Sequence, residues 1–139
     1  MIFNDSSKFI LESQAVVTTI YRDFNHYKLK LNATDQASNP LYLDVFVTHL
    51  KSSSGTDNKN LRKQMVDAFI TYLSTLPSNI NILLAGDLNL YTSSEPAFQE
   101  LLDIDNNNNI KLIDPANRIG SWSNNTTYLD VFTQSTRTT

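Results

Sequence analysis

Residues 81–89, Asn-Ile-Leu-Leu-Ala-Gly-Asp-Leu-Asn, contain the features that decide the fold. Their apolar part, residues 82–85, is short and unbroken, which is typical of a strand buried on both faces of an α/β sheet. Gly86 ends this run and lets the backbone turn. Asp87 and Asn89 follow at once, beyond the carboxyl end of the predicted strand, where open α/β sheets bind their ligands.

Asp87 and Asn89 together predict a particular chemistry. Two residues apart in extended backbone, their side chains point to the same side. The carboxylate only accepts hydrogen bonds, whereas the carboxamide also donates them. This pair suits a base or metal ligand beside a donor to an anionic oxygen. The alternative is an ordinary turn, because Gly, Asp and Asn are all turn-forming residues.

A second stretch is built in the same way. Residues 42–47, Tyr-Leu-Asp-Val-Phe-Val, alternate like a strand and end in a polar cluster that begins at His49. Two strands that each end in a titratable residue can converge on one site. The alternative for His49 is a histidine held in the core by a neighbour.

The order of these motifs resembles a known family. His-Leu-Lys-Ser at residues 49–52, then Arg62 and Gln64 on a helix, then Leu-Ala-Gly-Asp-Leu-Asn at residues 84–89 are similar to the endonuclease/exonuclease/phosphatase superfamily. The resemblance is strong over residues 46–89 and loose elsewhere. It implies an α+β or α/β fold of the deoxyribonuclease-I-like type, a two-sheet, four-layer sandwich with mostly antiparallel or mixed strands.

The resemblance also implies an activity. Members of this family hydrolyse phosphodiester or phosphomonoester bonds with Mg²⁺ or a similar cation such as Mn²⁺. By resemblance, Asp87 orients or deprotonates the attacking water and is a candidate metal ligand, and Asn89 donates to a phosphoryl oxygen. His49 stabilises the charged transition state or delivers a proton. A phosphate ester, with nucleic acid favoured, is the expected substrate.

Several residues of the family pattern have no counterpart here. Members carry an early Asn and a metal-binding Glu before this region, and an Asp and a final Asp-His pair after it. We therefore expect residues 1–139 to be a single, incomplete domain with weak or no activity alone, and with open sheet edges that favour self-association. Two alternatives stay open: a phosphatase or sphingomyelinase-type phosphodiesterase of the same fold, and a non-catalytic scaffold module.

The composition of the chain limits which kinds of site and binding are possible. The chain has 139 residues and a net charge of −3, which argues against nucleic-acid binding through a broad basic face. It has no cysteine, so disulfides and thiolate metal sites are excluded. The first residues lack the pattern of a signal peptide, and no apolar run has membrane-spanning length. The compartment stays open, although family members with such a middle segment are often exported, which favours a secreted or periplasmic protein.

Periodicity predicts the remaining elements. Residues 60–76 show an apolar helical face, with Asp57 or Asn58 as the cap and Pro77 as the end. A second helix is expected from Glu95. A lone histidine, His26, falls in a predicted turn and is expected to be solvated. Strand signals occur at residues 9–11, 16–21, 27–32, 41–48, 110–113, 121–123 and 128–132.

One loop resembles a calcium-binding pattern. Its oxygen-bearing residues stand at positions 1, 3, 5, 7 and 12 of that pattern: Asp103, Asp105, Asn107, Asn109 and Asp114. Asn108 replaces the glycine of the sharp turn, and Asp114 replaces the bidentate Glu. The alternative is a solvated acidic turn. A Ca²⁺ site is thus a second, separate metal prediction.

Overall fold

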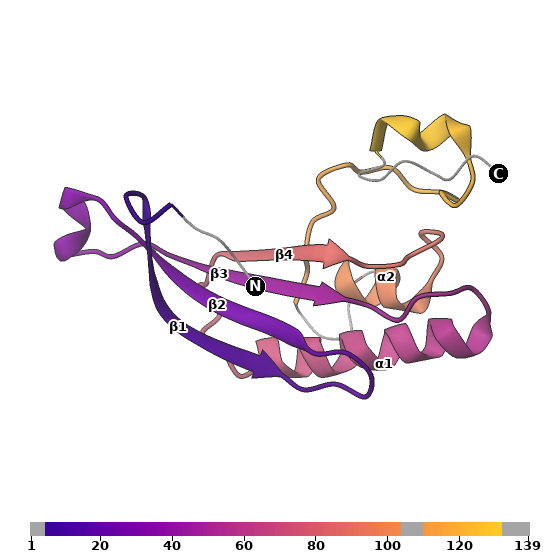
Figure 1. The fold of residues 1–139 in the computed structure, drawn as a ribbon, viewed down its shortest axis with the longest axis horizontal. Coiled ribbons are helices and arrows are strands. Elements are labelled where there is room, and N and C mark those ends of the chain that lie inside the picture. The colour runs from indigo at the N-terminus through magenta and orange to yellow at the C-terminus, as the bar shows by residue number, and fades with distance from the viewer. Residues whose placement is uncertain (1–4, 104–109, 132–139) are drawn as a thin grey trace.

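The computed structural model of the protein describes residues 5–103 and 110–131 (Figure 1). The strands are β1 (Phe9–Val17), β2 (Phe24–Leu31), β3 (Tyr42–His49) and β4 (Ile82–Asp87). The α-helices are α1 (Thr56–Leu73) and α2 (Pro96–Leu101), and two 3₁₀ segments cover Thr34–Ala37 and Thr126–Val131.

The strands form one mixed sheet in the order β1-β2-β3-β4. β1, β2 and β3 pair antiparallel, whereas β4 pairs parallel to β3. Short connections permit the antiparallel pairs, and α1 carries the chain back so that β4 runs in the same direction as β3. The α/β class and the mixed strands are therefore confirmed.

The core lies between the sheet and α1, which runs along one face of it (Figure 1). The ring of Phe69 stacks on Phe24 with centroids 4.6 Å apart and meets Phe46 edge-on at 5.0 Å. Met65 is fully buried in the same cluster. These contacts confirm the predicted apolar face of the helix. The predicted side-chain cap is wrong, because Gly55 occupies the N-cap position and forms no such bond.

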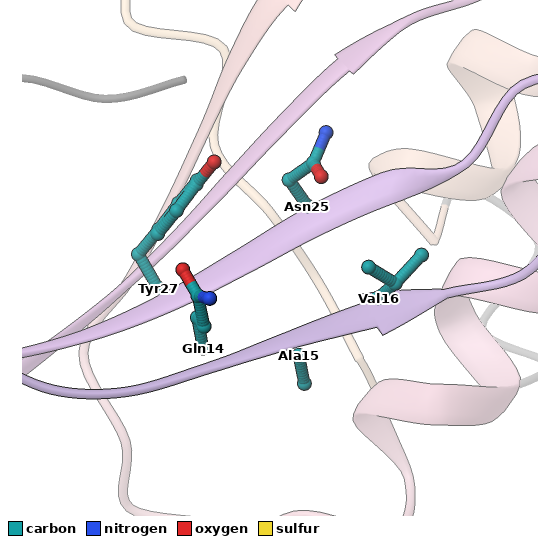
Figure 2. A pocket seen from close by; sticks show the side chains of 5 residues that line it. All are labelled: Gln14, Ala15, Val16, Asn25 and Tyr27. Atoms are coloured by element: carbon teal, nitrogen blue, oxygen red, sulfur yellow. The ribbon is translucent and has the colours of Figure 1, made fainter.

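The opposite face of the sheet is open and largely apolar. Figure 2 shows Gln14, Val16, Asn25 and Tyr27 on the same side of β1 and β2, around a pocket of about 220 Å³, with Ala15 pointing the other way. Val16 is 56% exposed. Leu29 and Val45, in the middle of the same face, are buried, so the exposed part of the face lies toward its edge strands.

The open face corrects one prediction. The strand at residues 82–85 was expected to be buried on both faces, but β4 lies at the sheet edge and its Leu83 is 49% exposed. Ile82 and Leu84 pack against the core instead. The physical reason is that α1 covers only one face of the strand.

Several predicted strands also differ from the structure. Segment 9–11 and residues 16–17 belong to one strand, β1, which ends at Val17, so residues 18–21 of the second predicted strand are not part of the sheet. Segment 110–113 forms no strand, and segment 121–123 contributes a single bridge, Thr92 to Ser121. In the predicted strand at residues 128–132, residues 128–131 belong instead to the 3₁₀ segment Thr126–Val131. These segments have residues typical of strands, but in the described part of the chain no strand lies beside them with which they could form a sheet.

Candidate active site

β3 and β4 end side by side, and the polar residues at their ends meet. Because the strands are parallel, His49 and Asp87 are direct partners in the register. His49 Nε2 lies 3.8 Å from Asp87 Oδ2. The two side chains are 54% and 42% exposed, so both are accessible to a ligand. The structure therefore brings these two predicted residues together.

Gly86 makes this close approach possible. A Cβ atom at this position would lie 1.9 Å from the carbonyl oxygen of Thr48 on β3. Its φ of 137° is also in a region that side chains rarely adopt. Just beyond it, the backbone N–H of Leu50 donates to the Asp87 carbonyl at 3.0 Å. The two strand ends are thus joined beside the His49–Asp87 pair.

Asn89 is held by two hydrogen bonds. Its backbone N–H donates to Asp87 Oδ1 at 3.1 Å, and its Nδ2 donates to the carbonyl of Leu50 at 3.2 Å. Its φ is 48°, so the expected extended backbone from Asp87 to Asn89 is wrong. The Asp87 side chain closes a local turn instead. A carboxamide has two N–H donors, so one donor of Asn89 remains for a ligand.

A buried ion pair supports both strand ends. Arg62 on α1 and Glu95 before α2 are both fully buried, with Arg62 Nε 2.8 Å and Nη2 2.7 Å from Glu95 Oε2. The sequence placed Arg62 on a helix between the two strand-end motifs but did not identify Glu95 as its partner. The partners lie 33 residues apart, so no local pattern connects them.

The same ion pair also binds the two loops that follow the strands. Arg62 Nη1 donates to the carbonyls of Lys51 (2.8 Å) and Ser53 (3.0 Å), after β3. Glu95 Oε1 accepts from the backbone N–H of Tyr91 (2.9 Å), after β4. Arg62 and Glu95 therefore fix the loops that carry the candidate site residues on both sides.

His26 lies away from this site. It is buried within β2, with Nε2 2.7 Å from Asp44 Oδ1 and Nδ1 3.0 Å from the hydroxyl of Tyr72. Its ring stacks on Phe46. The expectation of a solvated turn histidine is therefore wrong, because β2 begins at Phe24 and carries His26 into the core.

The described residues include one candidate metal ligand at the strand ends, Asp87. Among them, no group of three or more His, Asp and Glu side chains is placed to hold a metal ion. Asp87 offers one carboxylate at the strand ends. Mg²⁺ commonly binds through one or two carboxylates, several waters and substrate phosphates, so Asp87 fits a shared site of that kind.

Most of the calcium-like loop lies outside the described residues. Asp105, Asn107 and Asn109 fall within residues 104–109, which are not among the described residues. Asp103 is buried, and Asp114 Oδ1 accepts the backbone N–H of Ala116 at 3.0 Å. The Ca²⁺ site stays a prediction.

The paired strand ends belong to a known class of fold. The sheet, α1 and α2 correspond to part of the deoxyribonuclease-I-like fold, as the sequence resemblance implied. The human Nocturnin catalytic domain is similar over 68% of this chain, with a TM-score of 0.56 and 17% identity. A humanised TDP2 from D. rerio is similar over 71%, with a TM-score of 0.50 and 16% identity.

The chain corresponds to only part of each solved structure. The chain matches 35% of the Nocturnin structure and 36% of the TDP2 structure, so it spans about a third of each. Comparison with family models and with curated proteins finds no match. At this identity the solved structures establish the fold. Separately, no helix within residues 5–103 and 110–131 combines the length and apolar content needed to cross a membrane.

Proposed function

We propose that this chain is part of a metal-dependent phosphodiester hydrolase, most similar in its action to a nuclease. The observation that carries the proposal is the His49–Asp87 pair at 3.8 Å across two parallel strand ends, with the amide of Asn89 bonded to the loop beyond β3. The solved Nocturnin structure holds a sulfate anion, whose shape and charge resemble phosphate. The bound sulfate supports the proposal that a protein of this fold binds an oxyanion.

In the proposed mechanism, each residue has a separate role. Asp87 accepts a proton from the attacking water and orients it. The free N–H of Asn89 donates to a phosphoryl oxygen where negative charge develops. His49, when protonated, donates a hydrogen bond to the phosphoryl group or a proton to the leaving oxygen. A Mg²⁺ or Mn²⁺ ion, held by Asp87, would supply positive charge to the phosphate oxygens.

The expected four-layer sandwich has a second sheet in addition to the one described above. We propose that a second sheet covers the open face and completes the four-layer sandwich. The exposed apolar side chains of Leu11, Val16 and Leu83 support this, because a sheet face of this kind is normally buried. The chain alone then lacks part of its catalytic surroundings, and we expect its activity to be weak or absent.

The proposal is tested by plasmid nicking with Mg²⁺, with Mn²⁺ and with EDTA. Any nicking by the parent is expected to be slow, to require metal, and to disappear in His49→Ala and Asp87→Ala. Lys28→Gln, on the sheet away from the strand ends, serves as the control. Nicking that persists in EDTA, or in both alanine variants, would contradict the proposal.

The alternatives predict different substrates. RNA, sphingomyelin vesicles and inositol phosphates are assayed beside DNA under the same conditions. Preferred hydrolysis of the lipid or the inositol phosphate would identify the phosphatase or sphingomyelinase-type alternative. A non-catalytic module would show the same melting temperature with and without Mg²⁺ or Mn²⁺, because a bound ion stabilises the folded state.

A further inference from the structure

The turn between β1 and β2, residues 18–23, brings a second set of polar groups to the same end of the sheet. Side chains within the turn fix its shape. The backbone N–H of Thr19 donates to Asp23 Oδ1, and the Thr19 hydroxyl donates to the carbonyl of Arg22, both at 2.8 Å. Thr48 Oγ1 donates to the Asp23 carbonyl at 3.2 Å. Arg22 is therefore held in a defined turn against the end of β3.

The guanidinium of Arg22 reaches the candidate active site. Its Nη1 donates to the carbonyl oxygens of Leu50 at 3.4 Å and His49 at 3.5 Å. The Leu50 oxygen also accepts the amide of Asn89 at 3.2 Å. Since Arg22 and Asn89 share one acceptor, their side chains are neighbours. These bonds use one nitrogen of Arg22, and a guanidinium carries five N–H donors in total.

A second cation contacts the same tyrosine ring as Arg22. The Lys51 Nζ is 5.1 Å from the ring centroid of Tyr21, and the Arg22 Cζ is 5.3 Å from the same centroid. Tyr21 is 49% exposed, so the cluster lies at the surface. Lys51 Nζ donates to the carbonyl of Ser52 at 3.0 Å.

Arg22 and Lys51 bring two positive charges to one tyrosine ring. Within the described part of the chain, neither Arg22 nor Lys51 forms an ion pair. The whole chain carries a net charge of −3, so two unpaired cations around one ring are a local exception. An anion bound at this ring would balance the two positive charges.

We propose that Arg22 and Lys51 form an anion subsite for a phosphate group of the substrate, next to the phosphate that faces His49 and Asp87. The choice of ligand rests on the proposed function. The planar fork of Arg22 suits two phosphate oxygens, and Lys51 adds a point charge. The ligand class is a phosphate monoester or diester anion, and Tyr21 supports both cations.

Binding of inorganic phosphate to the 139-residue chain, followed by NMR titration without metal, tests this subsite. Arg22→Gln and Lys51→Gln are each expected to weaken phosphate binding by at least about tenfold, because each removes a charged hydrogen bond. Lys28→Gln is the matched control, since Lys28 lies 4.6 Å from the ring centroid of Tyr42 at the other end of β3. Arg22→Lys, which keeps the charge, is expected to retain part of the affinity.

Three results would overturn the subsite: no phosphate binding by the parent, parent-like binding in Arg22→Gln and Lys51→Gln, or equal weakening in Lys28→Gln. Melting temperatures of all variants show that they are folded. Because the titration needs neither metal nor turnover, its result is independent of the nicking assay. Loss of nicking activity therefore tests the proposed function, and loss of phosphate binding tests the subsite.

A second pair of titrations identifies where the phosphate comes from. The parent and Arg22→Gln are titrated with a single-stranded oligodeoxynucleotide and with phosphatidylglycerol vesicles. A defect confined to the oligonucleotide assigns the phosphate to a nucleic-acid strand, and a defect confined to the vesicles assigns it to a lipid headgroup. Equal binding by parent and variant to both ligands would contradict the subsite.

Discussion

At the residue scale, Gly86 determines how closely β3 and β4 approach at the candidate site. We predict that Gly86→Ala lowers the free energy of unfolding by roughly 2 kcal/mol more than Gly55→Ala, as measured by urea denaturation. Gly55 is a matched control because its φ of 96° is also positive, yet no atom lies within 4 Å of the Cβ position. Equal losses would show that the contact with Thr48 has no energetic effect.

Single residues also show what the sequence predicts and what it does not. The proximity of His49 and Asp87 was predictable, because both follow strand patterns and the ends of parallel strands meet at one edge. For Asn89 the sequence left an extended backbone and a turn open, and the bond from its N–H to the Asp87 side chain favours the turn. The environment of His26 was missed, since it depends on where β2 begins.

At the scale of the elements, the Arg62–Glu95 pair connects α1 to the two loops of the site. We predict that Arg62→Met alone lowers the free energy of unfolding by roughly 3–5 kcal/mol, because it leaves Glu95 buried without its partner. The double variant Arg62→Met/Glu95→Met is expected to recover most of that loss, as measured by urea denaturation. Equal instability of the single and double variants would contradict this account.

The double variant also tests whether the ion pair holds the two loops, separately from its effect on the free energy of unfolding. Its backbone N–H groups at residues 51–53 and 91 are expected to exchange with solvent faster than in the parent, because the loop carbonyls lose Arg62 and Tyr91 loses Glu95. Unchanged exchange would mean that other contacts hold these loops. The α1 core face was predictable from its period, whereas this long-range pair was not.

Lys63 links α1 to α2 and gives a pH-dependent prediction. Burial lowers its pKa, but hydrogen bonds to Asp67 and Glu100 outweigh burial and leave the pKa raised. A raised pKa means that Lys63 stabilises the fold fully below its unfolded-state pKa of about 10.4 and loses this contribution as pH rises through the folded value. Between about pH 9.5 and 11.5, the melting temperature of the parent is expected to fall more than that of Lys63→Met.

At the scale of the whole molecule, the open sheet face dominates the expected behaviour. Apolar side chains such as Val16 and Leu83 are about half exposed, and β1 and β4 are edge strands. We predict that the 139-residue chain self-associates at micromolar concentration, as measured by size-exclusion chromatography with light scattering. A monomer at all concentrations would contradict this prediction. The order of the strands was predictable only in part. The position of β4 at the edge depends on which elements cover the two faces of the sheet, and the sequence pattern does not show this.

An NMR titration of the chain with the dinucleoside phosphodiester TpT in the presence of Mg²⁺ tests directly whether the two strand ends bind one phosphate group. If His49, Asp87 and Asn89 form one phosphate-binding site, the amide signals of residues 48–51 and 86–89 shift together, and these shifts are reduced in Asp87→Ala. Signals that stay unchanged at both strand ends, or shift only elsewhere on the sheet, would contradict the account.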